Sequence, residues 1–175
     1  MKNLSIFLLF LFISSFANGQ SIKKLDKITK DANEAKAAFL ETDPHLQTLF
    51  ESSHGYVIFP NIGKGGLGVG GATGNGVVWE KGQLVGYAKM TQLTLGFQAG
   101  GQGYSEVIFF QNKEAFDRFT SNKIEFGAEV SAVAIKPQAS VGAKYLNGVL
   151  VFTQSKGGLM YEASLGGQKF SYTAK

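Results

Sequence analysis

One glycine pattern in the sequence has the spacing of a nucleotide-binding motif. Gly63, Gly65 and Gly68 have the offsets of the dinucleotide fingerprint. That chemistry needs a helix directly after the glycines, because the helix N-terminus holds the pyrophosphate. Residues 69–74 read Val-Gly-Gly-Ala-Thr-Gly, which cannot sustain a helix. The pattern therefore predicts no nucleotide site.

Few residues could carry catalysis or hold a metal. The chain has no cysteine, and its two histidines, His45 and His54, are nine positions apart with no carboxylate at a fixed offset. Ser105 lacks the second glycine of a nucleophile elbow. The 13 carboxylates are scattered, so a two-carboxylate hydrolase stays open by count alone. We predict no catalytic residue, no metal and no cofactor, and we expect that the protein is not an enzyme.

A lysine cluster is the one segment with a binding chemistry attached. It consists of Lys23, Lys24, Lys27 and Lys30, and it lies against an apolar stripe over residues 22–28. A basic face beside an apolar stripe is typical of a helix that lies in a membrane interface. The same stripe also fits a helix that packs on the protein's own core. Each buried aliphatic residue gains about 1.5–3 kcal/mol in either place, so the stripe does not decide.

The composition of the basic residues bears on the class of partner. Arg118 is the only arginine among 17 basic residues, and the formal net charge is +4. Because bidentate recognition of phosphate or guanine favours arginine, we expect no nucleic-acid partner. A mild lysine excess fits attraction to an anionic lipid surface, and it fits ordinary solubility equally well.

The N-terminal residues have the order of a secretory signal. Lys2 precedes an apolar run over residues 4–13, and Ala17 and Gly19 occupy the positions before a cleavage point at Gln20. The run is too short for a bilayer span of about 20 residues. We therefore expect a signal peptide over residues 1–19, a single domain over residues 20–175, and a periplasmic or secreted location.

Apolar spacing predicts helices first and strands later. Residues 22–41 fit a helix, and Asp43-Pro44 restarts a short one that ends before Gly55. Asn112 is expected to cap a helix over residues 113–120. Residues 74–76, Gly-Asn-Gly, read as a turn, as do residues 80–82. Strands are expected over residues 56–59, 67–71, 77–79, 84–88, 91–99, 106–110, 128–135, 148–154, 158–164 and 168–172.

The 23 glycines lie mainly inside the expected strands, where they indicate curvature or close backbone approach. We predict an α+β fold: a strongly curved, mostly antiparallel, glycine-rich sheet or barrel, with an N-terminal helical segment and one inserted helix. The lack of strand–helix alternation argues against a doubly wound fold.

Spaced motifs from about residue 35 to the C-terminus resemble the SYLF (Ysc84-like) family. They are residues 55–60 (Gly-Tyr-Val-Ile-Phe-Pro), 64–71 (Lys-Gly-Gly-Leu-Gly-Val-Gly-Gly), 74–77, 86–87, 95–100, 109–119, 152–159 and 163–167. The version resembled is the exported bacterial one, although the lipoprotein cysteine of many bacterial relatives is missing. Lys136-Pro137 stands where eukaryotic members carry Gly-Pro.

The resemblance implies a non-catalytic lipid-binding domain of the bacterial envelope, with an anionic lipid or membrane surface as its partner. Family residues for lipid contact are basic and near the N-terminal helix, which maps loosely onto Lys23, Lys24 and Lys27. If that helix only packs on the sheet, the lipid site would lie around Lys64 and Lys156. The alternative is a structural or interaction module of the periplasm with an envelope protein as partner.

Overall fold

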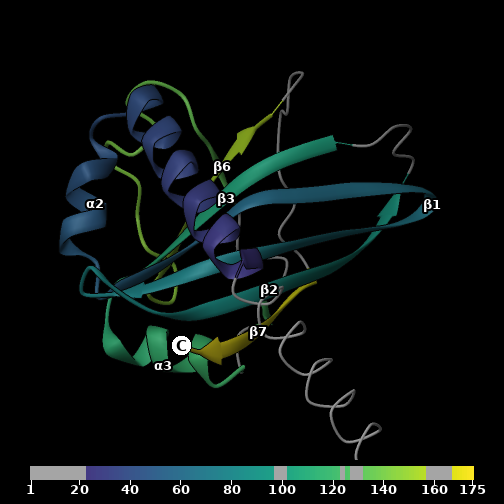
Figure 1. The fold of residues 1–175 in the computed structure, drawn as a ribbon. Helices are drawn as coiled ribbons and strands as arrows, with labels where there is room; N and C mark the ends of the chain where they lie inside the picture. The colour runs from purple at the N-terminus through teal and green to yellow at the C-terminus, as the bar shows by residue number, and fades with distance from the viewer. Residues whose placement is uncertain (1–22, 97–101, 123–124, 127–131, 157–166) are drawn as a thin grey trace, which may run out of the picture.

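The computed structural model describes residues 23–96, 102–122, 125–126, 132–156 and 167–175. Over these ranges the chain forms an α+β fold, in which helices cover both faces of one sheet (Figure 1). The expected signal peptide, residues 1–19, and the expected strand over residues 158–164 lie outside the described residues.

The sheet has the strand order β4-β7-β2-β1-β3-β6-β5. Its described strands are β1 (Gly55–Glu80), β2 (Gln83–Gly96), β3 (Gln102–Phe110), β4 (Glu125–Phe126), β5 (Val133–Ala134), β6 (Val149–Ser155) and β7 (Gln168–Ala174). Neighbouring strands pair antiparallel, except for the parallel pair of β5 and β6. The prediction of a mostly antiparallel sheet is confirmed.

The sheet is open, with β4 and β5 as its two edges, so the barrel alternative is wrong. The physical reason is that both faces are buried. Ile58 and Phe109 belong to one apolar cluster, whereas Val57, Ile108 and Phe110 belong to the other. In a small barrel, only the inner face of the sheet packs around the interior core. Here both faces of the sheet pack against helices.

β1 runs out and then folds back beside itself (Figure 1). Its first part pairs with β3 and its second part with β2. The two parts approach closely: a Cβ built at Gly74 would lie 2.7 Å from Ile62 Cγ1, and one at Gly76 would lie 2.7 Å from Phe59 Cδ1. The prediction of a turn at residues 74–76 is therefore wrong, because these glycines make room for the other part of β1. The turn at residues 80–82 is confirmed, with positive φ at Lys81 and Gly82.

The N-terminal helix spans residues 23–42 and packs with α2 (Leu46–Ser52) on one face of the sheet. The α3 helix (Lys113–Thr120) packs on the other face. The Asn112 side chain accepts a hydrogen bond from the Ala115 backbone N–H at 2.9 Å, which confirms the predicted cap. Pro44 does not begin α2, contrary to the prediction; it lies in the preceding turn, and α2 begins two residues later. Among the described residues, no helix combines the length and apolarity that a bilayer span requires.

Candidate functional site

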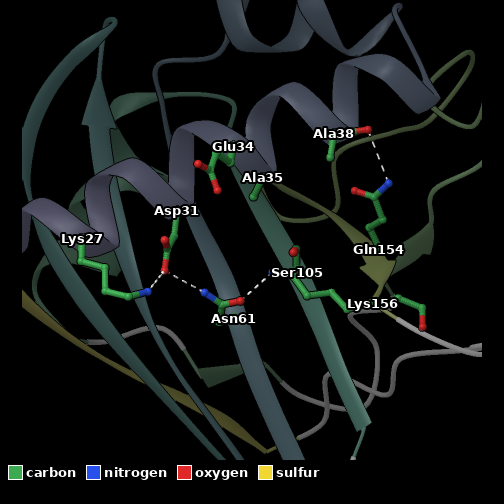
Figure 2. Close-up of a pocket in the computed structure, with 10 residues that line it drawn as sticks. Lys27, Asp31, Glu34, Ala35, Ala38, Asn61, Ser105, Gln154 and Lys156 are labelled. Carbon is green, nitrogen blue, oxygen red and sulfur yellow. Dashed lines mark hydrogen bonds and ion pairs between the residues drawn. The ribbon is translucent and has the colours of Figure 1, made fainter.

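A cleft of about 480 Å³ lies between the N-terminal helix and the sheet, and Figure 2 shows its walls. We call it the helix–sheet cleft. The helix forms one wall, and β1, β3 and β6 form the other. The residues that line it are Lys27, Asp31, Glu34, Ala35, Ala38, Asn61, Ser105, Gln154, Ser155 and Lys156.

Helical spacing places three charged residues on the flank that faces this cleft. Lys27, Asp31 and Glu34 are separated by four and three positions, so they share one side of the helix. Ala35, on the same wall, is buried, and its small side chain lets the helix lie near the strands. The helix packs on the sheet through Ala32, Ala35 and Phe39. Of the expected stripe over residues 22–28, Ile28 is partly buried against the same apolar cluster, as the packing interpretation expects, and residue 22 lies outside the described residues.

A chain of polar contacts crosses the cleft from helix to sheet. Lys27 Nζ lies 2.8 Å from Asp31 Oδ2, and Asn61 Nδ2 donates to the same oxygen at 3.1 Å. Lys156 Nζ donates to Asn61 Oδ1 at 2.5 Å. The hydrogen bond to Asp31 raises the pKa of Lys27, so Lys27 stays cationic throughout the physiological range. Asn61 reaches both partners because it lies at the irregularity where β1 shifts register against β3.

Two further polar side chains of the lining are held by hydrogen bonds. Ser105 Oγ donates to the Pro60 carbonyl at 2.8 Å. Gln154 Nε2 donates to Thr42 Oγ1 at 3.0 Å, which ties β6 to the C-terminal end of the N-terminal helix. These contacts fix the walls of the helix–sheet cleft, so its polar groups are largely preorganised.

A second cleft, of about 340 Å³, lies on the other flank of the same helix. Lys24, Leu25 and Ile28 come from the helix, and Tyr87 and Lys89 come from β2. Its lining combines aliphatic side chains with two cations, a combination that suits an amphipathic group such as a lipid near its headgroup.

The structure separates the lysines that the sequence grouped. Lys27 and Lys156 come together in the helix–sheet cleft, and Lys24 lies on the opposite flank of the helix. Lys23 is exposed, and Lys30 Nζ lies 3.7 Å from Glu34 Oε1. Lys64 is half-buried in β1 and lines neither of these two clefts.

Sequence reasoning missed the partners of these lysines. The spacing of Lys27 with Asp31 and of Lys30 with Glu34 is four residues in each pair, which is a readable signal for ion pairs on a helix. Asn61 gave no such signal, because its role depends on a register shift between strands that are distant in sequence.

The two histidines occupy separate places in the structure. The His45 side chain is exposed and its Nδ1 lies 3.2 Å from Asp43 Oδ1, whereas His54 Nε2 lies 2.9 Å from Glu80 Oε1 in a largely buried position. Over the part of the chain that the structure describes, no three His, Cys, Asp or Glu side chains gather as metal ligands would. Gly63, Gly65 and Gly68 lie within β1, so the prediction that no helix follows these glycines is confirmed.

Comparison with known proteins relates part of this fold to a family. Residues 91–174 match the family model Ysc84, described as "Las17-binding protein actin regulator". The chain thus carries a Ysc84 (SYLF) family domain. It is similar to Beta cell expansion factor A from Aeromonas veronii, with 32% identity over 140 residues. That match covers 79% of this chain and 53% of the relative, so the chain spans about half the length of the curated relative that it matches.

The family match has a consequence for the cleft. It contains Ser105, Gln154 and Lys156 on the sheet wall, but it begins after the N-terminal helix and Asn61. The helix wall, with Lys27, Asp31 and Glu34, thus lies outside the residues that the family model covers.

Proposed function

We propose that this domain is a non-catalytic module of the bacterial envelope that binds anionic membrane surfaces. The observation that carries the proposal is the placement of the N-terminal helix on the outside of the sheet, with exposed lysines and a cleft on each flank. Membership of the Ysc84 (SYLF) family supports a binding role over catalysis.

The ion pairs of the helix support a division among its lysines as membrane contacts. Lys27 and Lys30 lie near the carboxylates of Asp31 and Glu34, which reduces their pull on anionic lipid. Lys23 and Lys24 are exposed on the first turn of the described helix, and neither forms an ion pair with another described residue. We therefore assign the larger share of the electrostatic attraction to Lys23 and Lys24.

A variant pair tests this assignment. Replacing Lys23 and Lys24 with Gln removes about 2 kcal/mol of attraction at low salt, because each lysine near an anionic surface is worth about 1 kcal/mol. Vesicle co-sedimentation should therefore show binding about thirtyfold weaker. The matched control replaces Lys113 and Lys175, which lie on the α3 side of the sheet, and should change binding little. Equal losses in both variants would contradict the assignment.

The second candidate function is a protein-interaction module of the envelope. One observation favours it: Leu93, near the far end of β2, has 71% of its surface exposed. An exposed leucine offers apolar surface whose burial by a partner protein would be favourable. Replacing Leu93 with Ser should leave vesicle binding unchanged if lipid is the partner, and it should abolish capture of an envelope protein if that is the partner.

A further inference from the structure

The helix–sheet cleft carries two positive and two negative side chains. Lys27 and Lys156 supply the cations, and Asp31 and Glu34 supply the carboxylates, so the charge of the lining sums to zero. A lining of zero net charge does not suit a purely anionic group, because a phosphate that approaches the lysines also approaches two carboxylates. It suits a ligand that carries both signs.

Two of the four charges are poorly matched within the protein. Lys27 and Asp31 form a close ion pair at 2.8 Å. Lys156, in contrast, donates to the neutral amide oxygen of Asn61, and no described carboxylate pairs with it. Glu34 Oε1 lies 3.7 Å from Lys30 Nζ, and both side chains are mostly exposed, which makes a weak pair. One cation and one carboxylate are therefore left to interact with a ligand.

We propose that the helix–sheet cleft binds a zwitterionic headgroup that carries a phosphate and a primary ammonium, as phosphoethanolamine does. The phosphate contacts Lys156, and the ammonium contacts Glu34. This inference rests on the proposed membrane-binding function and names the headgroup for one of its clefts. A volume of about 480 Å³ is within the range of small-molecule sites, and Figure 2 shows Glu34 and Lys156 on the opposing walls.

The same geometry discriminates among headgroups. A primary ammonium has three N–H donors for the Glu34 carboxylate and neighbouring amide oxygens. A trimethylammonium group has no N–H donor, so it forms no charge-assisted hydrogen bond there. A glycerol headgroup brings no cation at all and leaves Glu34 facing the phosphate.

The experiment compares vesicles at a constant fraction of phosphatidylglycerol, so that general anionic attraction is equal. The remaining lipid is either phosphatidylethanolamine or phosphatidylcholine. We expect the full chain to bind the phosphatidylethanolamine vesicles about tenfold more tightly, the equivalent of one charge-assisted hydrogen bond. Glu34→Gln and Lys156→Gln should each abolish this preference. Glu41→Gln, an exposed change on the same helix, is the matched control and should keep it.

The ratio between the two vesicles is the readout, because Glu34→Gln also frees Lys30 and raises binding to both. Soluble glycerophosphoethanolamine, titrated by calorimetry, distinguishes a free ligand from a lipid. If it binds and no vesicle does, and Glu34→Gln removes that binding, the cleft inference stands and the membrane proposal fails.

Equal binding of both vesicle types by the wild-type protein would overturn the cleft inference and leave the membrane proposal intact. An undiminished preference in both variants, with folding verified by thermal unfolding, would also overturn it. Absence of binding to every vesicle and to the soluble compound would overturn both.

Discussion

At the scale of single residues, two buried carboxyl groups decide how stability depends on pH. Asp43 is fully buried where the N-terminal helix ends, and Glu106 is fully buried in the middle of β3. They have opposite surroundings. Asp43 is surrounded by hydrogen-bond donors, whereas Glu106 has one donor, Gln168 Nε2 at 3.0 Å, and its Oε1 has no partner among the described residues.

Replacement of Asp43 should destabilise the protein at neutral pH. Burial alone would raise the pKa of Asp43, but hydrogen bonds from the Ser140 hydroxyl and backbone and from His45 hold it below its ordinary value. We expect Asp43→Asn to lower the free energy of unfolding by about 2–3 kcal/mol at pH 7, because the NH2 group of the asparagine side chain would face hydrogen-bond donors. The depressed pKa stabilises the fold above the unfolded pKa, and that contribution is lost as the pH falls through the folded value. Urea unfolding should therefore show a smaller difference between wild type and variant at pH 3 to 4.

Replacement of Glu106 should act in the opposite direction. Burial raises the pKa of Glu106 to about 7, so the folded state favours the neutral acid. Stability should fall as the pH rises from the unfolded value of about 4.3 to about 7, by about 3 kcal/mol in total. Glu106→Gln retains the shape without the charge, and it should be more stable than wild type at pH 8. Thermal unfolding from pH 4 to pH 8 checks this, and a variant destabilised equally at every pH would contradict it.

At the scale of the elements, the helices were more predictable than the sheet. The periodic apolar residues predicted the bounds of the N-terminal helix to within about one residue, and Asn112 predicted the start of α3. β1 was not predictable as one strand, because Pro60 and residues 74–76 resemble stops. Pro60 is tolerated where β1 shifts register against β3, and Gly74 lies beside the other part of the same strand.

The glycines of β1 differ in the space around them, because the strand folds back beside itself. At Gly76 a Cβ would lie 2.7 Å from Phe59 Cδ1 and 2.9 Å from the Ile58 carbonyl oxygen, so Gly76→Ala should cost about 1–3 kcal/mol through overpacking. Gly63→Ala is the control within the same strand, because a Cβ there meets nothing within 4 Å. Denaturant unfolding of both variants should show a loss at residue 76 and little change at residue 63; equal losses would mean that β1 does not fold back as described.

At the scale of the whole molecule, the sequence predicted the lysines near the N-terminal helix, but neither their carboxylate partners nor the shape of the two clefts. The lysines were identifiable from their cluster. The apolar stripe was compatible both with a helix in a membrane interface and with a helix packed on the protein's own core. In the structure the helix packs on the sheet through Phe39 and Ala32, with Ile28 of the stripe partly buried against the same cluster, and a cleft lies on each flank of the helix. Asn61 and Gln154 could not be predicted, because each contacts the helix from a strand that is distant from it in the sequence.

The central claim is that the domain binds anionic membrane surfaces through electrostatic attraction. Co-sedimentation of the wild-type protein with vesicles of phosphatidylglycerol and of phosphatidylcholine, at low and at physiological salt, tests it most directly. We predict binding to the anionic vesicles that weakens as salt shortens the Debye length from about 30 Å to about 8 Å, with little binding to the neutral ones. Equal binding to both vesicles, or binding to neither at low salt, would contradict the claim.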